Sequence, residues 1–322
     1  MQFIKKINKD NWFGIKIREI PDYNYKAIWN NLITTRFDRG NIKELPIENP
    51  EFIDVGISSK CETGKCMFCY VNASDKGEYF SDICNTWRKW MNTYHDNIND
   101  NIMYTDKVFQ IAIGSTGEPT EHPQFCDFLK TVYETNVVPN YTTNGVILSY
   151  YDMPDNKYYY QANKILEYTS KYVGGVAVSY GNKYLRKYAD KAIDALLNNG
   201  NCHVMIHHII SDNASVDDFI NCYLKYKDKI KNHVLLPLMP NGRSKNKIKD
   251  ESFEYLLNKI NEYNIDNVAF GANFIPYLNK TDKVKTWLFP PESYSKNVLI
   301  KNNEIIITPS SFNLNPLKII KL

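Results

Sequence analysis

The chain has 322 residues, enough for one large domain or two ordinary ones, and its formal net charge of +3 is too small to indicate a nucleic-acid partner by itself. Its seven cysteines are an odd number and four of them are scattered singly, which excludes a disulfide framework and fits a reducing compartment. Residues 1–10 contain no apolar signal core, and no run approaches the roughly 20 apolar residues of a membrane span. We therefore expect a cytoplasmic protein with no membrane partner.

Residues 1–50 predict an extended N-terminal extension, with hairpin character around Phe37-Asp38-Arg39-Gly40-Asn41. From residue 51 onward, short apolar runs rich in β-formers alternate with segments of helical period. The runs fall at 52–58, 108–113, 138–143, 174–179, 202–210, 232–238 and 266–270. The helical segments fall near 81–95, 123–135, 157–171, 184–199, 215–228 and 251–263.

This alternation predicts βαβ units and a parallel sheet. Six such units predict an α/β fold, a partial (β/α)6 TIM-like barrel over residues 51–270, in which ligands gather at the carboxyl ends of the strands. The last segment, residues 271–322, shows no helical pattern. It ends in an expected β-hairpin over 298–307 that turns at Asn302-Asn303.

Three thiols fall close together directly after the first apolar run, in the stretch Cys61-Glu62-Thr63-Gly64-Lys65-Cys66-Met67-Phe68-Cys69-Tyr70. Thiolates are soft ligands that suit iron–sulfur clusters and zinc. In a cluster of four irons, three cysteines leave one iron without a protein ligand. With a distant His or Cys, the same three would instead close a structural zinc site, and the spacing alone leaves both interpretations open.

Polar motifs follow the later strands, where the chain reads Gly114-Ser115-Thr116-Gly117-Glu118-Pro119-Thr120, Tyr141-Thr142-Thr143-Asn144-Gly145, Val176-Ala177-Val178-Ser179-Tyr180 and Leu236-Pro237-Leu238-Met239-Pro240. A glycine in such a loop lets the backbone approach a ligand, and Glu118 supplies an acceptor. The fifth strand carries His203, His207 and His208. Because side chains alternate along a strand, His203 and His207 share one face and His208 takes the other, and we expect one of His207 and His208 to line a substrate cavity.

Taken together, the cysteine loop and the motifs after the second, third and fourth strands resemble the radical S-adenosylmethionine (radical SAM) superfamily over about residues 50–240. The cysteine spacing departs from the family, which has three residues and then two, where this chain has four and then two. The resemblance implies that a reduced [4Fe–4S] cluster on Cys61, Cys66 and Cys69 cleaves S-adenosylmethionine (SAM). The resulting 5′-deoxyadenosyl radical abstracts hydrogen from the substrate, and the electron comes from a donor of the flavodoxin or ferredoxin type.

The cofactor-binding residues that the resemblance implies are Phe68, Gly117, Glu118, Thr142, Asn144, Ser179 and Leu238. Among them, Glu118 is expected to hold the SAM amine, and Phe68 and the strand end at Leu238 are expected to lie near adenine. The polar residues are expected to reach the ribose or the carboxylate. No protein side chain is implied as the catalytic group, because the cofactor performs the hard chemistry.

The substrate is expected to be a peptide or another molecule, because the C-terminal extension resembles a degenerate SPASM or Twitch extension. No cysteine follows Cys222, so a second cluster is not expected there. An alternative substrate is a nucleotide or nucleic-acid base, motivated by the basic loop that carries Arg243, Lys245 and Lys247 after the sixth strand. A second alternative is a non-catalytic zinc-binding interaction protein.

Overall fold

In the computed structural model, the described residues are 13–23, 25–30, 33–37, 47, 50–64, 66–91, 95–99, 102–105, 108–181, 183–200, 202–281 and 295–322. Within these ranges, ten strands form one sheet in the order β12-β11-β10-β9-β8-β7-β4-β13-β14-β15. Its parallel barrel strands are β4 (Phe52–Gly56), β7 (Gln110–Ile113), β8 (Val138–Thr143), β9 (Gly175–Ser179), β10 (His203–Ile210), β11 (Asn232–Pro237) and β12 (Val268–Phe270).

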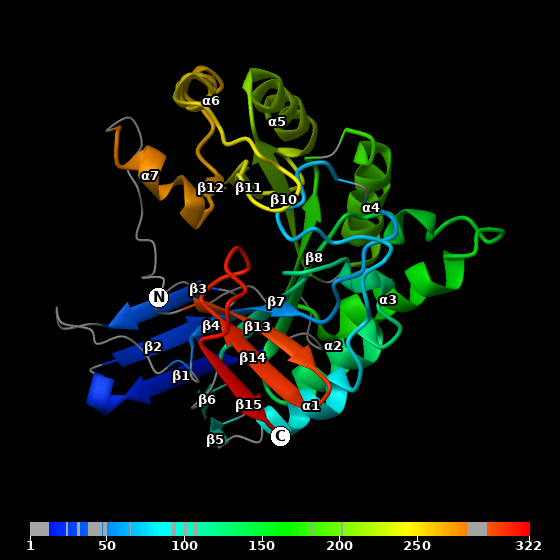
Figure 1. Ribbon diagram of the computed structural model, residues 1–322, viewed down its shortest axis with the longest axis vertical. Helices are drawn as coiled ribbons and strands as arrows, with labels where there is room; N and C mark the ends of the chain where they lie inside the picture. The colour runs from blue at the N-terminus through cyan, green and yellow to red at the C-terminus, as the bar shows by residue number, and fades with distance from the viewer. Residues whose placement is uncertain are drawn as a thin grey trace.

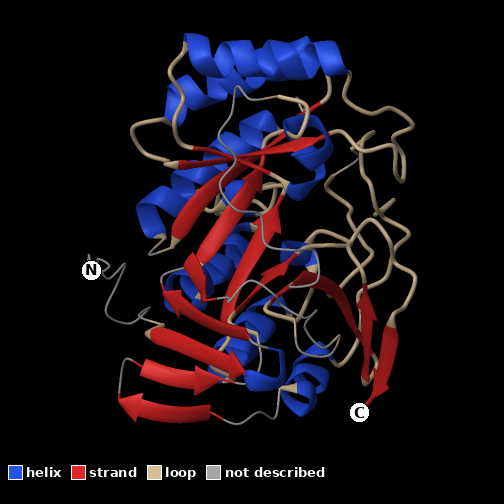
Figure 2. Ribbon diagram, turned by 90° about the vertical axis from the view of Figure 1, so that its left-hand side faces the viewer, coloured by secondary structure: helices blue, strands red, loops and turns tan. Residues whose placement is uncertain are grey.

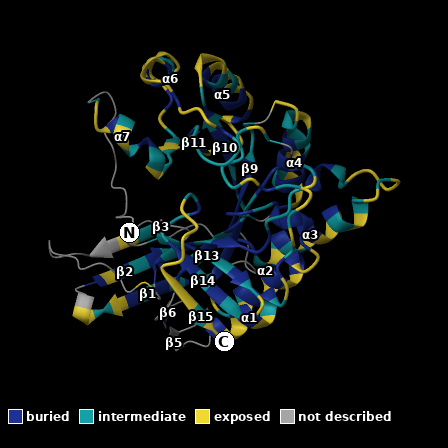
Figure 3. Cartoon of the chain, in the orientation of Figure 1, coloured by how far each residue is buried: buried dark blue, intermediate teal, exposed yellow. Residues whose placement is uncertain are grey.

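Six helices connect successive strands of this sheet and form an arc around its outer face (Figure 1). They are α1 (Ile83–Trp90), α2 (Phe125–Glu134), α3 (Tyr159–Tyr172), α4 (Arg186–Asn199), α5 (Asn213–Tyr226) and α6 (Asp250–Glu262). Each helix buries its apolar stripe on the strands and leaves its polar face in solvent, so that buried and exposed residues alternate around the helices in Figure 3. The predicted partial (β/α)6 TIM-like barrel is confirmed, with each of the seven expected strand runs in place.

The predicted helix over 81–95 is too long, because α1 ends at Trp90. Two short strands that the sequence did not predict, β5 (His95–Asn99) and β6 (Ile102–Thr105), follow it. Asparagine and aspartate are frequent here, and these residues compete with helical hydrogen bonding. Residues 271–322 also hold a short helix, α7 (Ile275–Leu278), where no helical pattern was expected, because a single turn is too short to show a period.

The N-terminal region forms an antiparallel meander of β1 (Ile15–Ile20), β2 (Tyr25–Asn30) and β3 (Ile33–Phe37). Strand β6 adds to β1 in parallel and β5 pairs with β6, so the described residues give a second sheet of five strands, in the order β3-β2-β1-β6-β5. Figure 2 shows this sheet beside the barrel. Trp29 packs with Phe109 and Val138, which fixes the sheet to the barrel. The turn expected at 37–41 lies outside the described residues except for Phe37.

The C-terminal region continues the main sheet through β13 (Ser295–Lys301), β14 (Glu304–Thr308) and β15 (Lys318–Lys321). Strand β13 pairs in parallel with β4, and β14 returns antiparallel to β13. Asn302 and Asn303 form the turn with φ of 52° and 62°, the left-handed conformation of a two-residue hairpin. The predicted hairpin and its turn are therefore confirmed. The predicted domain boundaries at residues 50 and 270 stay predictions, and the sheet continues across the second one. No helix in the described part of the chain has the length and apolar character of a membrane span.

Candidate functional site

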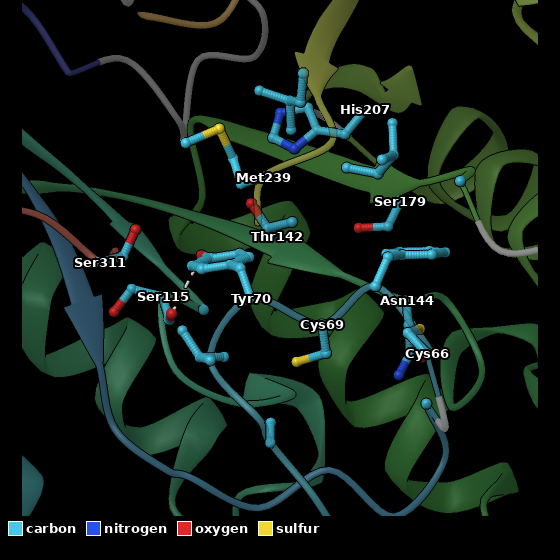
Figure 4. Close-up of a pocket in the computed structure, with 18 of the residues that line it drawn as sticks. Cys66, Cys69, Tyr70, Ser115, Thr142, Asn144, Ser179, His207, Met239 and Ser311 are labelled. Carbon is cyan, nitrogen blue, oxygen red and sulfur yellow. Dashed lines mark hydrogen bonds between the residues drawn. The ribbon is translucent and has the colours of Figure 1, made fainter. Parts of the chain in front are cut away.

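A cavity of about 430 Å³ opens at the carboxyl ends of the barrel strands. Its volume lies in the usual range for small-molecule sites. All ten residues predicted to bind the cluster or SAM line it: Cys61, Cys66, Phe68, Cys69, Gly117, Glu118, Thr142, Asn144, Ser179 and Leu238. Figure 4 shows Cys66, Asn144 and Ser179 on one side of the cavity and Tyr70, Ser115 and Ser311 on the other. The fold therefore brings residues from five strand ends to a single site.

The three cysteines of the loop form no disulfide and lie half-buried on the wall of this cavity. Gly64 leaves space for the first of them, because a Cβ at that position would lie 2.9 Å from the Cys61 sulfur. Burial and the carboxylates of Glu118 and Glu121 raise the pKa of the Cys61 thiol well above its ordinary value. A thiolate here therefore requires a nearby positive charge, which a bound metal centre would supply.

Among the described residues, no three His, Cys, Asp or Glu side chains converge closely enough to enclose a metal ion. The donor set nevertheless fits a cluster with one open iron. Three soft thiol donors come from one loop and face one cavity, which suits a cluster that keeps one iron without a protein ligand. A closed structural zinc site requires a fourth protein ligand beside the three thiols.

Glu121 holds the first half of the cysteine loop in place. Its carboxylate accepts hydrogen bonds from the backbone N–H of Glu62 at 2.8 Å, the backbone N–H of Thr63 at 3.0 Å and the Thr63 hydroxyl at 2.5 Å. Asn144 donates to the same hydroxyl at 2.8 Å and approaches the Cys61 sulfur at 4.0 Å. Glu121 was not among the residues predicted from the sequence, although its place three residues after Glu118 in the same loop was a usable signal.

Arg243 holds the second half of the loop. Its backbone N–H donates to the Cys69 carbonyl at 2.9 Å, its Nε to the Cys66 carbonyl at 2.7 Å and its Nη1 to the Ala73 carbonyl at 2.8 Å. Gly242 packs directly on the loop with a φ of 61°, and a Cβ there would lie 2.3 Å from the Cys69 carbonyl oxygen. The three basic residues of this loop therefore differ in role. Arg243 binds the cysteine loop, while Lys245 and Lys247 are exposed.

Glu118 joins the ends of β7 and β8. One carboxylate oxygen accepts from the Thr120 N–H at 3.3 Å and from the hydroxyls of Thr120 and Thr143 at 2.7 Å each, and the other accepts from the Asn144 N–H at 2.8 Å. Burial nevertheless raises the pKa of Glu118 to about 7, because desolvation outweighs these hydrogen bonds. Glu118 lines the cavity, but most of its acceptor capacity is used by the chain. Its role toward the SAM amine stays a prediction.

The two adjacent histidines of β10 take different environments. His207 lines the cavity near Ser179 and Met239 (Figure 4), and burial lowers its pKa to about 4, so the imidazole is neutral. His208 lies behind the sheet, where its ring stacks on His233 and the two ring nitrogens are 3.1 Å apart. Because side chains alternate along the strand, His207 faces the cavity and His208 faces the core, as the prediction that one of the two lines the cavity requires.

The C-terminal region supplies part of the cavity wall, which the sequence analysis did not predict. The rings of Tyr70 and Phe312 lie 4.5 Å apart, and Asn241 donates to the Phe312 carbonyl at 2.9 Å. The Tyr70 hydroxyl donates to the Ser115 carbonyl at 3.2 Å. On the first barrel strand, Asp54 also lines the cavity. The C-terminal region therefore contacts the site directly through Phe312.

No protein-family model and no curated protein matches the sequence. The fold is similar to that of SuiB from Streptococcus suis bound to S-adenosylmethionine, with a TM-score of 0.54 and 16% identity over 81% of this chain and 60% of SuiB. SuiB bound to the precursor peptide SuiA gives a TM-score of 0.52 and 17% identity over 82% and 60%. The chain thus matches about 60% of the length of SuiB. The predicted resemblance is confirmed at the level of the fold.

Proposed function

We propose that this chain is a radical SAM enzyme that binds a [4Fe–4S] cluster through Cys61, Cys66 and Cys69, and SAM in the adjoining cavity. One observation carries the proposal. The residues implied as cofactor ligands come from the ends of β4, β7, β8, β9 and β11, and all of them line one cavity. The carboxyl ends of parallel strands meet at one edge of a sheet, and here the side chains at those ends all line one cavity of about 430 Å³.

When bound and reduced, the cluster supplies the electron that cleaves SAM to methionine and the 5′-deoxyadenosyl radical. The chain's own residues bind, orient and exclude water. Glu121 and Arg243 fix the loop that carries the thiols. Phe68 and Leu238 offer apolar surface for adenine, and the Tyr70–Phe312 pair covers the cavity on the side of the C-terminal region.

A peptide is the substrate class that we favour. SuiB, which shares the fold, has been solved with a precursor peptide. Within the described part of the chain, no lysine or arginine lines the cavity, so a phosphate group would find no cationic partner there. Arg243, which motivated the nucleotide alternative, is already bound to the cysteine loop. An electron donor of the flavodoxin or ferredoxin type is the expected protein partner.

The proposal is tested by anaerobic reconstitution followed by metal analysis and product analysis. We expect about four irons per chain and slow formation of 5′-deoxyadenosine from SAM with dithionite. Cys66→Ala should abolish both, whereas Cys84→Ala should change neither, because Cys84 is a half-buried thiol outside the cavity. Stoichiometric zinc with no iron after reconstitution would refute the proposal and favour the zinc-binding alternative.

A further inference from the structure

Asp54 places an ionisable group inside the cavity for which the proposed cofactor chemistry has no use. It lies on β4, the first barrel strand, and lines the cavity. Its register partners on the neighbouring strands are Ala112 of β7 and Asn297 of β13. Paired residues of adjacent strands share one face of a sheet. The two side chains beside Asp54 on this face, Ala112 and Asn297, are both uncharged.

The Asp54 carboxylate has no hydrogen-bond donor or cation among the described residues. The nearby polar groups bind elsewhere, since the Asn297 amide donates to the Thr308 hydroxyl at 2.9 Å and the Tyr70 hydroxyl donates to the Ser115 carbonyl. The other carboxylate on the wall, Glu118, accepts several hydrogen bonds from the chain. Burial without a compensating charge raises the pKa of Asp54 to about 6.

The Asp54 side chain is half-buried on the cavity wall. A carboxylate that is partly removed from water and has no partner is costly, and folded proteins keep such groups where a ligand or a functional role requires them. The surroundings of Asp54 suit a cation. Asp54 lies near Tyr70, whose ring forms a tilted pair with that of Phe312 on the cavity wall, and aromatic faces attract ammonium and guanidinium groups. The described lining residues include no lysine or arginine that would compete.

We propose that Asp54 binds an ammonium or guanidinium group of the substrate. Naming this ligand the substrate rests on the proposed function, but the binding itself can be measured without SAM cleavage. The carboxylate, the absence of cations on the wall and the aromatic pair together select a cationic group over an anionic or purely apolar one. Asp54 is thus a specificity residue contributed by the first barrel strand.

The experiment measures dissociation constants of small probes by titration calorimetry on the full-length, reconstituted protein. The probes are acetyl-Ala-Lys-Ala-amide, the same peptide with norleucine or glutamate in place of lysine, and n-butylamine. The variants are Asp54→Asn and, as a matched control, Asp266→Asn, whose carboxylate is exposed and outside the cavity. SAM affinity and 5′-deoxyadenosine formation are measured in parallel.

We expect the lysine peptide to bind the unmodified protein about tenfold more tightly than the norleucine peptide, equivalent to one charge-assisted contact. Asp54→Asn should abolish this preference while leaving SAM affinity unchanged, and Asp266→Asn should preserve it. Binding of n-butylamine as tight as that of the peptide would support the cation site and identify a free amine as its ligand.

Two results would overturn the proposal. Equal binding of the lysine and norleucine peptides to the unmodified protein would do so without any variant, even if Asp54→Asn failed to fold. A loss of SAM affinity in Asp54→Asn would assign the carboxylate to the ammonium of SAM itself. The proposed function is tested by a different measurement. If the unmodified protein forms no 5′-deoxyadenosine, the proposed function fails, whatever the peptide affinities are.

Discussion

Arg243 offers the sharpest test of how the cysteine loop is held. Replacing it with glutamine removes the guanidinium hydrogen bonds to the Cys66 and Ala73 carbonyls, which measure 2.7 and 2.8 Å. Hydrogen bonds to a charged group contribute about 1.5–3 kcal/mol each, and the half-buried position places these two in the lower part of that range. We therefore expect the closed loop to lose about 3–4 kcal/mol in total, which raises the open population at least about 100-fold.

The assay is the rate of iron release to a chelator under anaerobic conditions, with urea unfolding as a second readout. Arg243→Gln should release iron much faster than the unmodified protein. Arg243→Lys should be intermediate, because an ammonium cannot reproduce the forked geometry of guanidinium. Lys245→Gln and Lys247→Gln are the controls, since both side chains are exposed in the same loop.

Unchanged iron release in Arg243→Gln would refute the reasoning. The nucleotide alternative predicts a different pattern. In that case the three basic residues act together, so each replacement should weaken binding of a nucleotide probe and reduce its salt dependence, with iron retention unaffected. The Arg243 variant thus separates a role in positioning the cysteine loop from a role in binding phosphate.

Two further predictions concern stability. The pKa of Asp54 is about 6 in the folded protein against a usual 3.8, so the unfolded chain loses this proton first and folding stability falls as pH rises between those values. In thermal unfolding, Asp54→Asn should therefore be more stable than the unmodified protein at pH 7.5 and equal to it near pH 4. The same stability difference between the two proteins at both pH values would contradict this prediction. Tyr70, which lies near Asp54, does not titrate in that pH range. In the C-terminal hairpin, Ile305→Ala should cost about 2–5 kcal/mol in urea unfolding, because Ile305 is fully buried in the barrel core. Ile319→Ala, at a half-exposed position of β15, should cost under about 0.5 kcal/mol, and equal losses would show that the hairpin is not part of the core.

The barrel and ten of the residues that line the cavity could be predicted from the amino-acid sequence alone. Apolar runs of β-forming residues and helical periods are local signals, so the seven barrel strands and six helices could be read in chain order. The residues at the strand ends were predictable for a related reason. In a parallel sheet, chain order and strand direction alone bring the carboxyl ends to one edge, so Cys61, Glu118 and Ser179 were expected at one site before any contact was known.

Which groups hold the cysteine loop in place, and which are left to bind a ligand, depends on tertiary contacts. Arg243 reaches the Cys66 carbonyl across 177 residues of sequence, and no local pattern distinguishes it from an exposed loop cation such as Lys245. The pairing of β13 with β4, which places Asn297 beside Asp54, likewise depends on how the C-terminal region packs. Local sequence fixes periodicity and strand direction, whereas desolvation and hydrogen-bond partners depend on segments that meet only in the folded chain.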